Sequence, residues 1–256
     1  MESMGIAMSR MIKEINKKHD INIDLTKIDK NRDEIQAEKS LEFTRINNRN
    51  KRRKMFKSSL VSDSNDLYST FDDFQTDKSY QVDELNKAKN IANRIYKGEI
   101  GNFLFTGKPG LGKTMLAVSI LNGLNKLDNT DLSCLFVSFE MFMELKKNSF
   151  NDKSGFIRDD IYKLEQCIKN CDVLVLDDLG SETSFENDLN VRTGSQYTQE
   201  TLFRIADYRK NKTNIITTNN DGRELQNMYH PKIISRLMTK KPENFIQFNG
   251  TDQRRG

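Results

Sequence analysis

Residues 107–114 read Gly-Lys-Pro-Gly-Leu-Gly-Lys-Thr, and this stretch decides the fold. It follows a short apolar run, 102–106, and precedes a helix-forming stretch, 113–125. It fits G-x-x-x-x-G-K-[ST] at every fixed position. Glycines let backbone N–H groups approach a polyphosphate closely at the positive end of a helix dipole. The pattern and its context therefore predict a phosphate-binding loop made of Gly107, Lys108, Pro109, Gly110, Leu111, Gly112, Lys113 and Thr114.

A second set of polar residues follows another apolar run, 173–176, which ends in Asp177 and Asp178. Ligands of open parallel sheets bind at the carboxyl ends of the strands, so Asp177 is expected beside the Thr114 hydroxyl as a partner of Mg²⁺. Asp178 could orient or deprotonate an attacking water, or it could cap a helix. Glu182 is the alternative catalytic carboxylate. Lys113 adds a full positive charge near the outer phosphates.

Apolar runs alternate with helical stretches from residue 101 onward. This alternation predicts an α/β fold with a parallel sheet. The expected strands are 102–106, 134–138, 173–176, 214–218 and 245–248, and the expected helices are 113–125, 139–147, 157–169, 196–209, 222–229 and 231–239. Asn219, just past the fourth strand, could hydrogen-bond a γ-phosphate or the water, or it could simply form a turn.

The front of the chain has a different composition. Residues 1–60 carry 15 basic and 9 acidic side chains, with a dense basic run at 49–54. Neither glycine nor proline occurs between Gly5 and Gly98, which predicts helices with polar connections. One helix would present Met4, Met8, Met11 and Ile15, and its methionines would either dock a helix of a partner or pack inside the chain's own core. A second, capped by Asp29 or Asn31, would turn Ile35, Leu41 and Phe43 or Ile46 toward a packing face.

These changes in composition predict three regions. Residues 1–60 form a small helical N-terminal region, 61–98 form a linker with a lead-in helix near 80–97, and 99–256 form the nucleotide-binding domain. The Ser/Asp/Asn-rich stretch 58–66 is interpreted as a linker.

Several classes of protein are excluded. No run approaches the ~18 apolar residues of a membrane span, and the start of the chain lacks the apolar segment of a signal peptide. Three cysteines and two histidines, unclustered, do not make a structural zinc site. We therefore expect a cytoplasmic protein without zinc and without a membrane partner.

As a set, the segments 101–121, 173–182 (VLVLDDLGSE), 202–209, 214–220 and 233–238 (IISRLM) resemble the AAA+ ATPases of the DnaC/DnaI helicase-loader type and their transposon relatives of the IstB type. The resemblance runs from about residue 71 to the C-terminus. It implies an AAA+ P-loop NTPase core with a five-stranded parallel sheet. Since the sequence stops just after the fifth strand, a C-terminal helical lid is not expected, and Arg254 or Arg255 is a weak candidate for sensor II.

The resemblance also implies roles for single residues. Asn219 corresponds to sensor I, and Arg236 to an arginine finger that reaches the ATP of a neighbouring subunit, so that self-association would be needed for hydrolysis. A surface salt bridge is the alternative for Arg236. The pair Asp177-Asp178 stands where many AAA+ proteins have Asp-Glu, which predicts slow hydrolysis.

Partners follow from the same resemblance. In the family, the region corresponding to 139–170 touches single-stranded DNA, and here Lys146, Lys147 and Phe150 resemble the contacting part. Lysines would pair with phosphates, and Phe150 would either stack on a base or belong to the core. The N-terminal region would grip the hexameric replicative helicase. The basic run 49–54 would contact DNA, contact an acidic helicase surface, or form a solvated face.

The sequence therefore predicts an ATP- and Mg²⁺-dependent loader of the replicative DNA helicase onto single-stranded DNA, in a bacterium or a phage. Two alternatives remain: an IstB-like ATPase that assists a transposase, and a non-hydrolysing, ATP-switched helicase adaptor.

Overall fold

The computed structural model describes residues 4–19, 25–127, 130–182, 184–185 and 192–250. The chain divides into two compact units, Met1–Asn48 and Arg49–Gly256. The larger unit contains the sheet and every buried side chain among the described residues.

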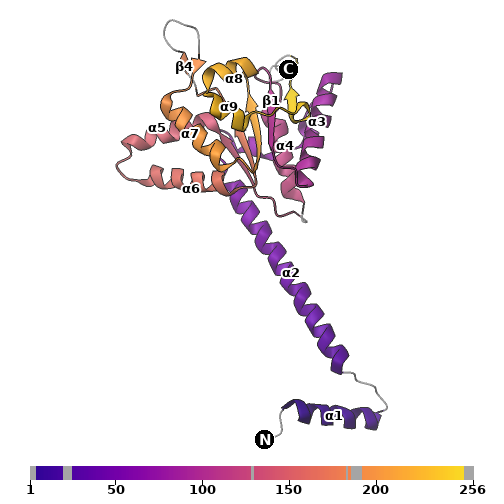
Figure 1. Cartoon of the computed structure of the whole chain (residues 1–256). Coiled ribbons are helices and arrows are strands. Elements are labelled where there is room, and N and C mark those ends of the chain that lie inside the picture. Colours follow the sequence, from indigo (N-terminus) through magenta and orange to yellow (C-terminus); the bar gives the residue numbers. More distant parts are fainter. Residues whose placement is uncertain (1–3, 20–24, 128–129, 183, 186–191, 251–256) are drawn as a thin grey trace. The chain divides into compact units, whose positions relative to one another are not determined.

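A five-stranded parallel sheet with the order β2-β3-β6-β1-β7 forms the centre of the larger unit (Figure 1). The strands are β1 (Asn102–Thr106), β2 (Cys134–Ser138), β3 (Val173–Asp177), β6 (Thr213–Thr218) and β7 (Phe245–Gln247). β1, which leads into residues 107–114, lies between β6 and β7. The predicted five-stranded parallel sheet is confirmed.

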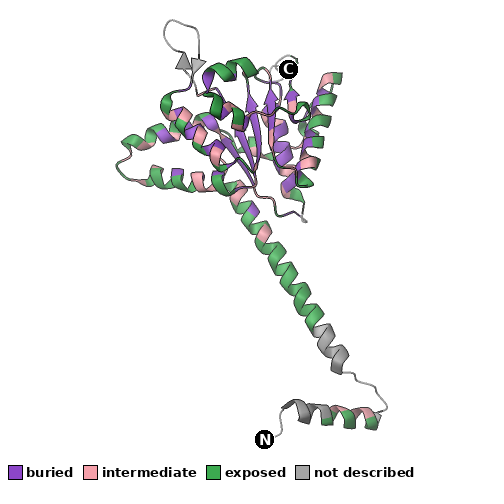
Figure 2. Ribbon diagram, viewed as in Figure 1, coloured by how far each residue is buried: buried purple, intermediate pink, exposed green. Residues whose placement is uncertain are grey.

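Helices cover both faces of this sheet. α3 (Ser79–Tyr96) and α4 (Lys113–Lys126) pack on one face. The other face carries α5 (Phe139–Asn148), α6 (Phe156–Asn170), α7 (Gln196–Tyr208), α8 (Gly222–Met228) and α9 (Pro231–Leu237). Side chains alternate across a strand, so Val173 and Val175 join the first layer while Leu174 and Leu176 join the second. The strands of the sheet are buried (Figure 2), and burial on both faces explains why they read as continuous apolar runs.

Short elements complete this unit. The 3-10 helices are η1 (Ser64–Tyr68), η2 (Phe71–Asp73), η3 (Ser149–Asn151) and η4 (Pro242–Asn244). A small antiparallel pair, β4 (Ser184–Phe185) and β5 (Arg192–Thr193), lies between β3 and α7 in the chain. This pair was not predicted from the sequence, because two residues per strand carry no periodic signal.

The segment 49–98 is part of the larger unit, which differs from the predicted boundary at residue 60. Leu60 pairs in parallel with the outer edge of β2: its N–H donates to the Phe136 carbonyl (2.9 Å), and its carbonyl accepts from the Ser138 N–H (2.9 Å). Within the basic run, Arg52 is buried and its Nη1 donates to the Leu127 carbonyl (3.0 Å). Long-range backbone contacts of this kind cannot be inferred from a Ser/Asp/Asn-rich composition.

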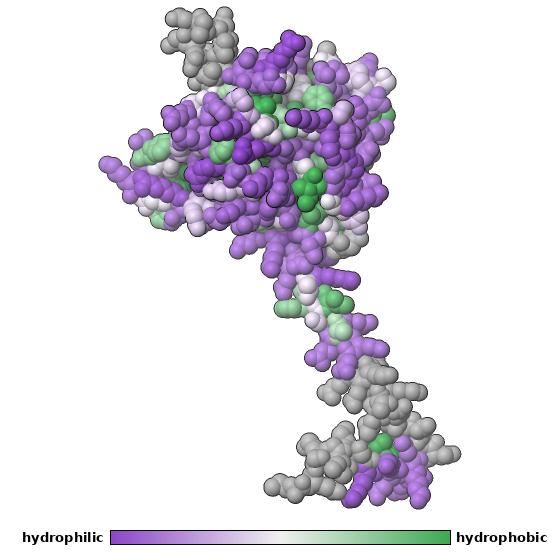
Figure 3. Space-filling model, in the orientation of Figure 1, coloured by the Kyte–Doolittle hydropathy of each residue, from purple (hydrophilic) through white to green (hydrophobic). Residues whose placement is uncertain are grey.

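The smaller unit contains α1 (Met4–His19) and the start of α2 (Leu25–Lys57). Asp29 and Asn31 lie inside α2, so neither caps it as predicted. The predicted packing face is also wrong: Ile35, Leu41, Phe43 and Ile46 are all exposed, because too few apolar residues occur along α2 to build a core against. Hydrophobic atoms are visible on the described part of α2 in Figure 3. Met11 is exposed as well, whereas the side chains of Met4 and Met8 lie outside the described residues.

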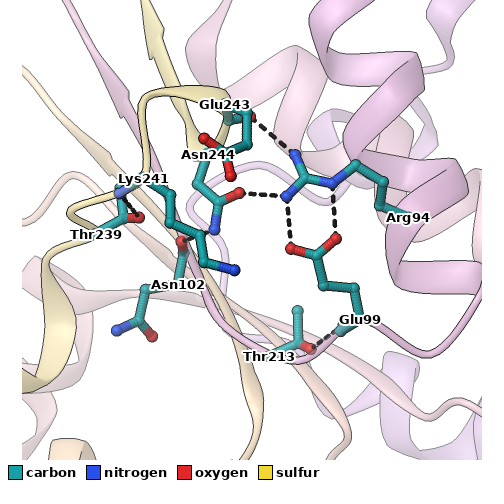
Figure 4. A network of polar contacts seen from close by, with 8 residues as sticks. All are labelled: Arg94, Glu99, Asn102, Thr213, Thr239, Lys241, Glu243 and Asn244. Atoms are coloured by element: carbon teal, nitrogen blue, oxygen red, sulfur yellow. Dashed lines mark hydrogen bonds and ion pairs between the residues drawn. The ribbon is translucent and has the colours of Figure 1, made fainter.

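A polar network joins the amino ends of the strands, opposite residues 107–114 (Figure 4). The Arg94 guanidinium donates to both carboxylate oxygens of Glu99, from Nε at 2.7 Å and Nη2 at 2.5 Å, and to Asn244 Oδ1 at 2.5 Å. Asn244 in turn donates to the Asn102 carbonyl (3.0 Å). The network ties the end of α3 to the residues that enter β1 and β7.

No described helix is long and apolar enough to cross a bilayer.

Candidate active site

The loop 107–114 connects β1 to α4 in a conformation that requires glycine. Gly107, Gly110 and Gly112 have φ of +145°, +78° and +85°. A Cβ atom on Gly107 would lie 2.6 Å from the Phe248 carbonyl oxygen, and one on Gly112 would lie 2.5 Å from the Phe74 ring. Phe74 and Phe248 therefore fix the loop from outside, a role that the motif alone does not reveal.

Lys113 is the first residue of α4 and its side chain is turned back over the loop. It is 4% exposed, and its Nζ donates to the carbonyls of Gly107 and Lys108 (both 2.8 Å) and to Asn219 Oδ1 (2.7 Å). If a polyphosphate bound to the loop, the Lys113 ammonium group would exchange these acceptors for phosphate oxygens. Asn219, which follows β6, is thus brought to the loop from a neighbouring strand.

Asp177 ends β3 and lies beside the loop. Its Oδ1 accepts hydrogen bonds from the Thr114 hydroxyl (2.9 Å) and the Thr217 hydroxyl (2.6 Å). Burial, followed by the neighbouring Asp178 carboxylate, raises the pKa of Asp177 to about 7 despite these two bonds and Lys113. A buried carboxylate with a threonine hydroxyl beside it suits a hard divalent cation, which would restore the ionised form of Asp177. No cluster of three or more His, Cys, Asp or Glu side chains is found in the described ranges.

Asp178 has a φ of +54°, alone among the described non-glycine residues in being positive. Aspartate and asparagine tolerate this left-handed conformation better than most residues. Its N–H donates to the Thr217 hydroxyl (2.9 Å), while no described residue donates to its carboxylate. It does not cap a helix, so the carboxylate is left for another partner.

Glu182 is engaged elsewhere. One of its carboxylate oxygens accepts from the Gly180 N–H (2.9 Å) and the other from the Tyr229 hydroxyl. Burial raises the pKa of Glu182. Because both oxygens are committed to the connection after β3 and to the end of α8, the geometry favours Asp178 over Glu182 as the carboxylate that could meet water.

Arg236 lies in the last turn of α9, partly buried against α7. Its guanidinium lies over the Phe203 ring (4.7 Å to the centroid), 3.6 Å from Asp207 Oδ1 at Nε, and donates from Nη1 to the Lys232 carbonyl (3.0 Å). The intrachain salt bridge weighed as an alternative is therefore present in the chain by itself. An ion pair at this length is weak and leaves the arginine able to change partners.

The predicted DNA contacts lie in the last turn of α5 and in the connection to α6, and one of them is wrong. Lys146 is buried, and its Nζ is paired with Glu165 Oε1 (2.6 Å), so it is not available to a phosphate. Lys147 is exposed. Phe150 is 63% exposed with its ring centroid 5.3 Å from that of Tyr197, which excludes a core position.

Further exposed residues of the connection and of the first turn of α6 were not predicted from the sequence. Phe156 is 75% exposed, and Lys153 and Arg158 are exposed as well. An aromatic residue that follows a glycine at the start of α6, as Phe156 follows Gly155, is a signal that could have identified it. Arg254 and Arg255, the sensor II candidates, lie outside the described residues.

The fold and this site together define an ATPase of the P-loop class. Residues 103–241 match the AAA family, the ATPases associated with various cellular activities, and the chain belongs to that family. Nucleotide binding is the property common to it.

Two kinds of relative agree with this assignment. The replicative helicase loader DnaC of Escherichia coli K12 is 28% identical over 171 residues, which cover 66% of this chain and 62% of DnaC. Among solved structures, DnaI superposes with a TM-score of 0.55 at 21% identity, covering 77% of this chain and 96% of that one. Domain III of the Thermotoga maritima replication initiation protein DnaA gives a TM-score of 0.53 at 18% identity, covering 76% and 71%. The chain thus spans less than two thirds of the length of DnaC, and the structural likeness concerns the fold.

Proposed function

We propose that this protein is an ATP-dependent loader of a replicative DNA helicase onto single-stranded DNA, in a bacterium or a phage. The observation that carries the proposal is the meeting of Lys113, Thr114, Asp177 and Asn219 at one edge of the sheet. The similarity to DnaC supports the biological role. Hydrolysis of ATP would switch the loader between its ATP-bound and ADP-bound states.

The loop and its neighbours would hold the nucleotide. Backbone N–H groups of 107–114 and the Lys113 ammonium bind the phosphates, and Thr114 and Asp177 hold Mg²⁺. The cation supplies neutralisation of the charge that builds up on the outer phosphates. When the phosphates bind, Lys113 Nζ leaves Asn219 Oδ1 and donates to a phosphate oxygen instead. The Asn219 side chain is then free to hydrogen-bond the γ-phosphate or the attacking water. Asp178 orients that water.

Arg236 completes the site of a neighbouring subunit. A guanidinium placed against the transferring phosphoryl group lowers the barrier by stabilising charge, and such residues are worth about 10³–10⁵ in turnover. Arg236→Ala is expected to abolish single-stranded-DNA-stimulated phosphate release while the Kd for ATP is unchanged. Loss of ATP binding instead would contradict the assignment.

Asp178→Asn tests the choice of carboxylate. It keeps the size and the tolerance of a positive φ but removes the charge that orients water. Phosphate release is expected to fall about 10²-fold or more with ATP affinity unchanged. Full turnover in Asp178→Asn combined with loss in Glu182→Gln would reverse the assignment.

Single-stranded DNA would bind at the last turn of α5 and the connection that follows it. Lys147 and Phe150 are exposed there and offer a phosphate contact and a stacking surface, worth about 1–3 kcal/mol for one base. Lys147→Ala should weaken binding and flatten its salt dependence, and Phe150→Ala should weaken it at all salt concentrations. Lys163→Ala, an exposed lysine of α6 paired with Asp160, is the matched control. Equal losses in all three would argue against this surface.

The helicase would bind the N-terminal unit, where exposed apolar side chains lie on α2. Phe43→Glu in the full-length chain should abolish co-purification with the cognate hexameric helicase in the presence of ATP, while phosphate release is retained. Helicase binding that survives in Phe43→Glu would show that this side chain is not part of the docking surface. Absence of helicase binding by the wild-type chain would favour the transposase-partner alternative. Helicase binding without measurable phosphate release favours the non-hydrolysing adaptor.

A further inference from the structure

The backbone of Arg236 is held from inside the molecule by a side chain of β1. Asn102 Nδ2 donates to the Arg236 carbonyl at 2.6 Å. The carbonyls of the last turn of a helix have no partner within the helix, and α9 ends at Leu237. Asn102 therefore supplies the missing donor at the residue whose guanidinium is the proposed finger.

The orientation of this amide is forced by its neighbours. Arg209 is fully buried, and its Nε donates to Asn214 Oδ1 at 2.5 Å. Asn214 Nδ2 then donates to Asn102 Oδ1 at 2.8 Å, which leaves Asn102 Nδ2 for the Arg236 carbonyl. A guanidinium has only donors and a carbonyl only accepts, so each amide between them can point one way. The chain of bonds is directional from Arg209 to Arg236.

The chain of hydrogen bonds is held in place at Arg209, where it starts, and again at Asn102, the last side chain before Arg236. Besides Asn214, Arg209 donates to the carbonyls of Ile168 (2.7 Å), Cys171 (2.9 Å), Asp172 (3.2 Å) and Thr213 (2.7 Å), which joins the end of α6 to the start of β6. Asn102 is also fixed through its backbone, because its carbonyl accepts from Asn244, which Arg94 holds in turn (Figure 4).

We propose that Asn102 is a positioning residue for Arg236: its side-chain amide fixes the end of α9 and thereby the placement of the guanidinium presented to a neighbouring subunit. This inference rests on the proposed finger role of Arg236. Asn102 does not touch the nucleotide. Its effect is confined to the subunit that donates the finger, so it leaves that subunit's own ATP site intact.

Asn102→Asp breaks one joint of the chain. The carboxylate still accepts from Asn214 Nδ2, but its other oxygen faces the Arg236 carbonyl, an acceptor against an acceptor. We expect turnover stimulated by single-stranded DNA to fall about 10- to 100-fold, the effect of a small misplacement of a catalytic group, with the Kd for ATP unchanged. Asn122→Asp is the matched control. Asn122 also carries an amide that donates to carbonyls, those of Leu67 and Ser69 (both 2.8 Å). It lies on α4 and joins that helix to η1 and the residue that follows it, away from α9. It should retain turnover.

Mixing subunits separates positioning from misfolding. Asp177→Asn subunits keep an intact Arg236 but hydrolyse poorly. An equal mixture with Asn102→Asp subunits, which keep an intact ATP site, should exceed the summed turnover of the two alone, as a mixture with Arg236→Ala should. Wild-type turnover in Asn102→Asp alone, or failure of its mixture to recover when the Arg236→Ala mixture recovers, would overturn the inference. Full turnover in Arg236→Ala alone would instead overturn the proposed finger and this inference with it.

Discussion

The two edges of the central sheet are built on opposite principles. The carboxyl edge, where the strands end, holds residues 107–114 with their positive φ angles and the buried Lys113. Asp177, whose carboxyl pKa is raised, lies beside them. At the amino edge, Arg94, Arg209, Asn102, Asn214 and Asn244 satisfy one another and the ends of the strands. Groups that must exchange partners collect at one edge, and groups that must not move collect at the other.

This difference assigns distinct consequences to changes at each edge. Substitutions at the carboxyl edge should alter nucleotide binding and chemistry, and at Asp177 and Gly112 they should alter stability as well. Substitutions at the amino edge should alter stability, or the placement of α9, without affecting affinity for nucleotide. The four predictions below test that division.

The largest effect is expected from Arg209→Met at the amino edge. Removing the guanidinium leaves several buried carbonyls without a donor, which costs about 3–5 kcal/mol of unfolding free energy. Urea denaturation measures the loss. Arg204→Met, on the exposed side of the same helix, is the control and should cost about 0.5 kcal/mol or less. The ATP affinity of the folded fraction should be unchanged, and a large drop in that affinity would blur the distinction between the edges.

The next effect is a dependence of stability on pH at the carboxyl edge. The pKa of Asp177 is about 7 when folded, raised by burial from an ordinary value of 3.8. Between these values the unfolded chain has released the proton that the folded protein keeps, so stability falls as pH rises toward 7. From pH 5 to pH 8 the contribution is about 2–3 kcal/mol.

Asp177→Asn lacks this contribution. Without nucleotide or Mg²⁺, the stability of Asp177→Asn relative to the wild type should therefore increase by about 2–3 kcal/mol between pH 5 and pH 8, as measured by urea denaturation at both values. Parallel curves for the two proteins would show that Asp177 is not protonated at pH 5.

A third effect concerns affinity. Lys113→Ala removes charge-assisted bonds to the phosphates and should weaken ATP binding about 10- to 100-fold, as measured by calorimetry with Mg²⁺. Lys126→Ala removes the same charge from the other end of α4 and should leave the Kd unchanged. If both variants lost affinity equally, the loop would be attracting nucleotide through net charge alone.

The smallest effect compares two glycines, one at each edge. Gly98 and Gly112 both have positive φ (+93° and +85°), but only at Gly112 does a Cβ meet another residue, Phe74. Each substitution by alanine costs about 1–2 kcal/mol of backbone strain. Gly112→Ala should cost about 1 kcal/mol more because of crowding. Repeating Gly112→Ala in a Phe74→Ala background should remove the excess, and an excess that persists would mean that Phe74 is not its source.

The sequence predicted most of the sheet and much of the loop because their signals are local. Each strand is an apolar run that is followed by a turn or polar residue, and residues 107–114 carry their own conformational requirement in their glycines. The order of the strands, and so the meeting of Asn219 with Lys113, depends on crossovers that no local pattern specifies.

The failures have a common physical cause. Lys146 reads as a surface charge until Glu165, which lies two helical elements later, is placed beside it. Leu60 reads as part of a linker until β2 offers it two hydrogen bonds. The apolar residues Ile35, Leu41, Phe43 and Ile46 of α2 read as a packing face, yet all four are exposed in the part of their unit that the structure describes. In each case the environment of the residue depends on which distant segments of the chain pack against it, and a local sequence pattern does not contain that information.

The strand-like pairing of Leu60 has a consequence for how copies of this protein can gather. Open sheet margins invite strands from other molecules and so promote fibrous growth. Here the protein's own chain occupies the middle of the β2 margin, where Leu60 takes up the Phe136 carbonyl and the Ser138 N–H, and the Ser59 hydroxyl accepts from the Phe136 N–H (3.0 Å). Copies of the protein at high concentration are therefore protected along that edge of the sheet from pairing strand to strand into aggregates.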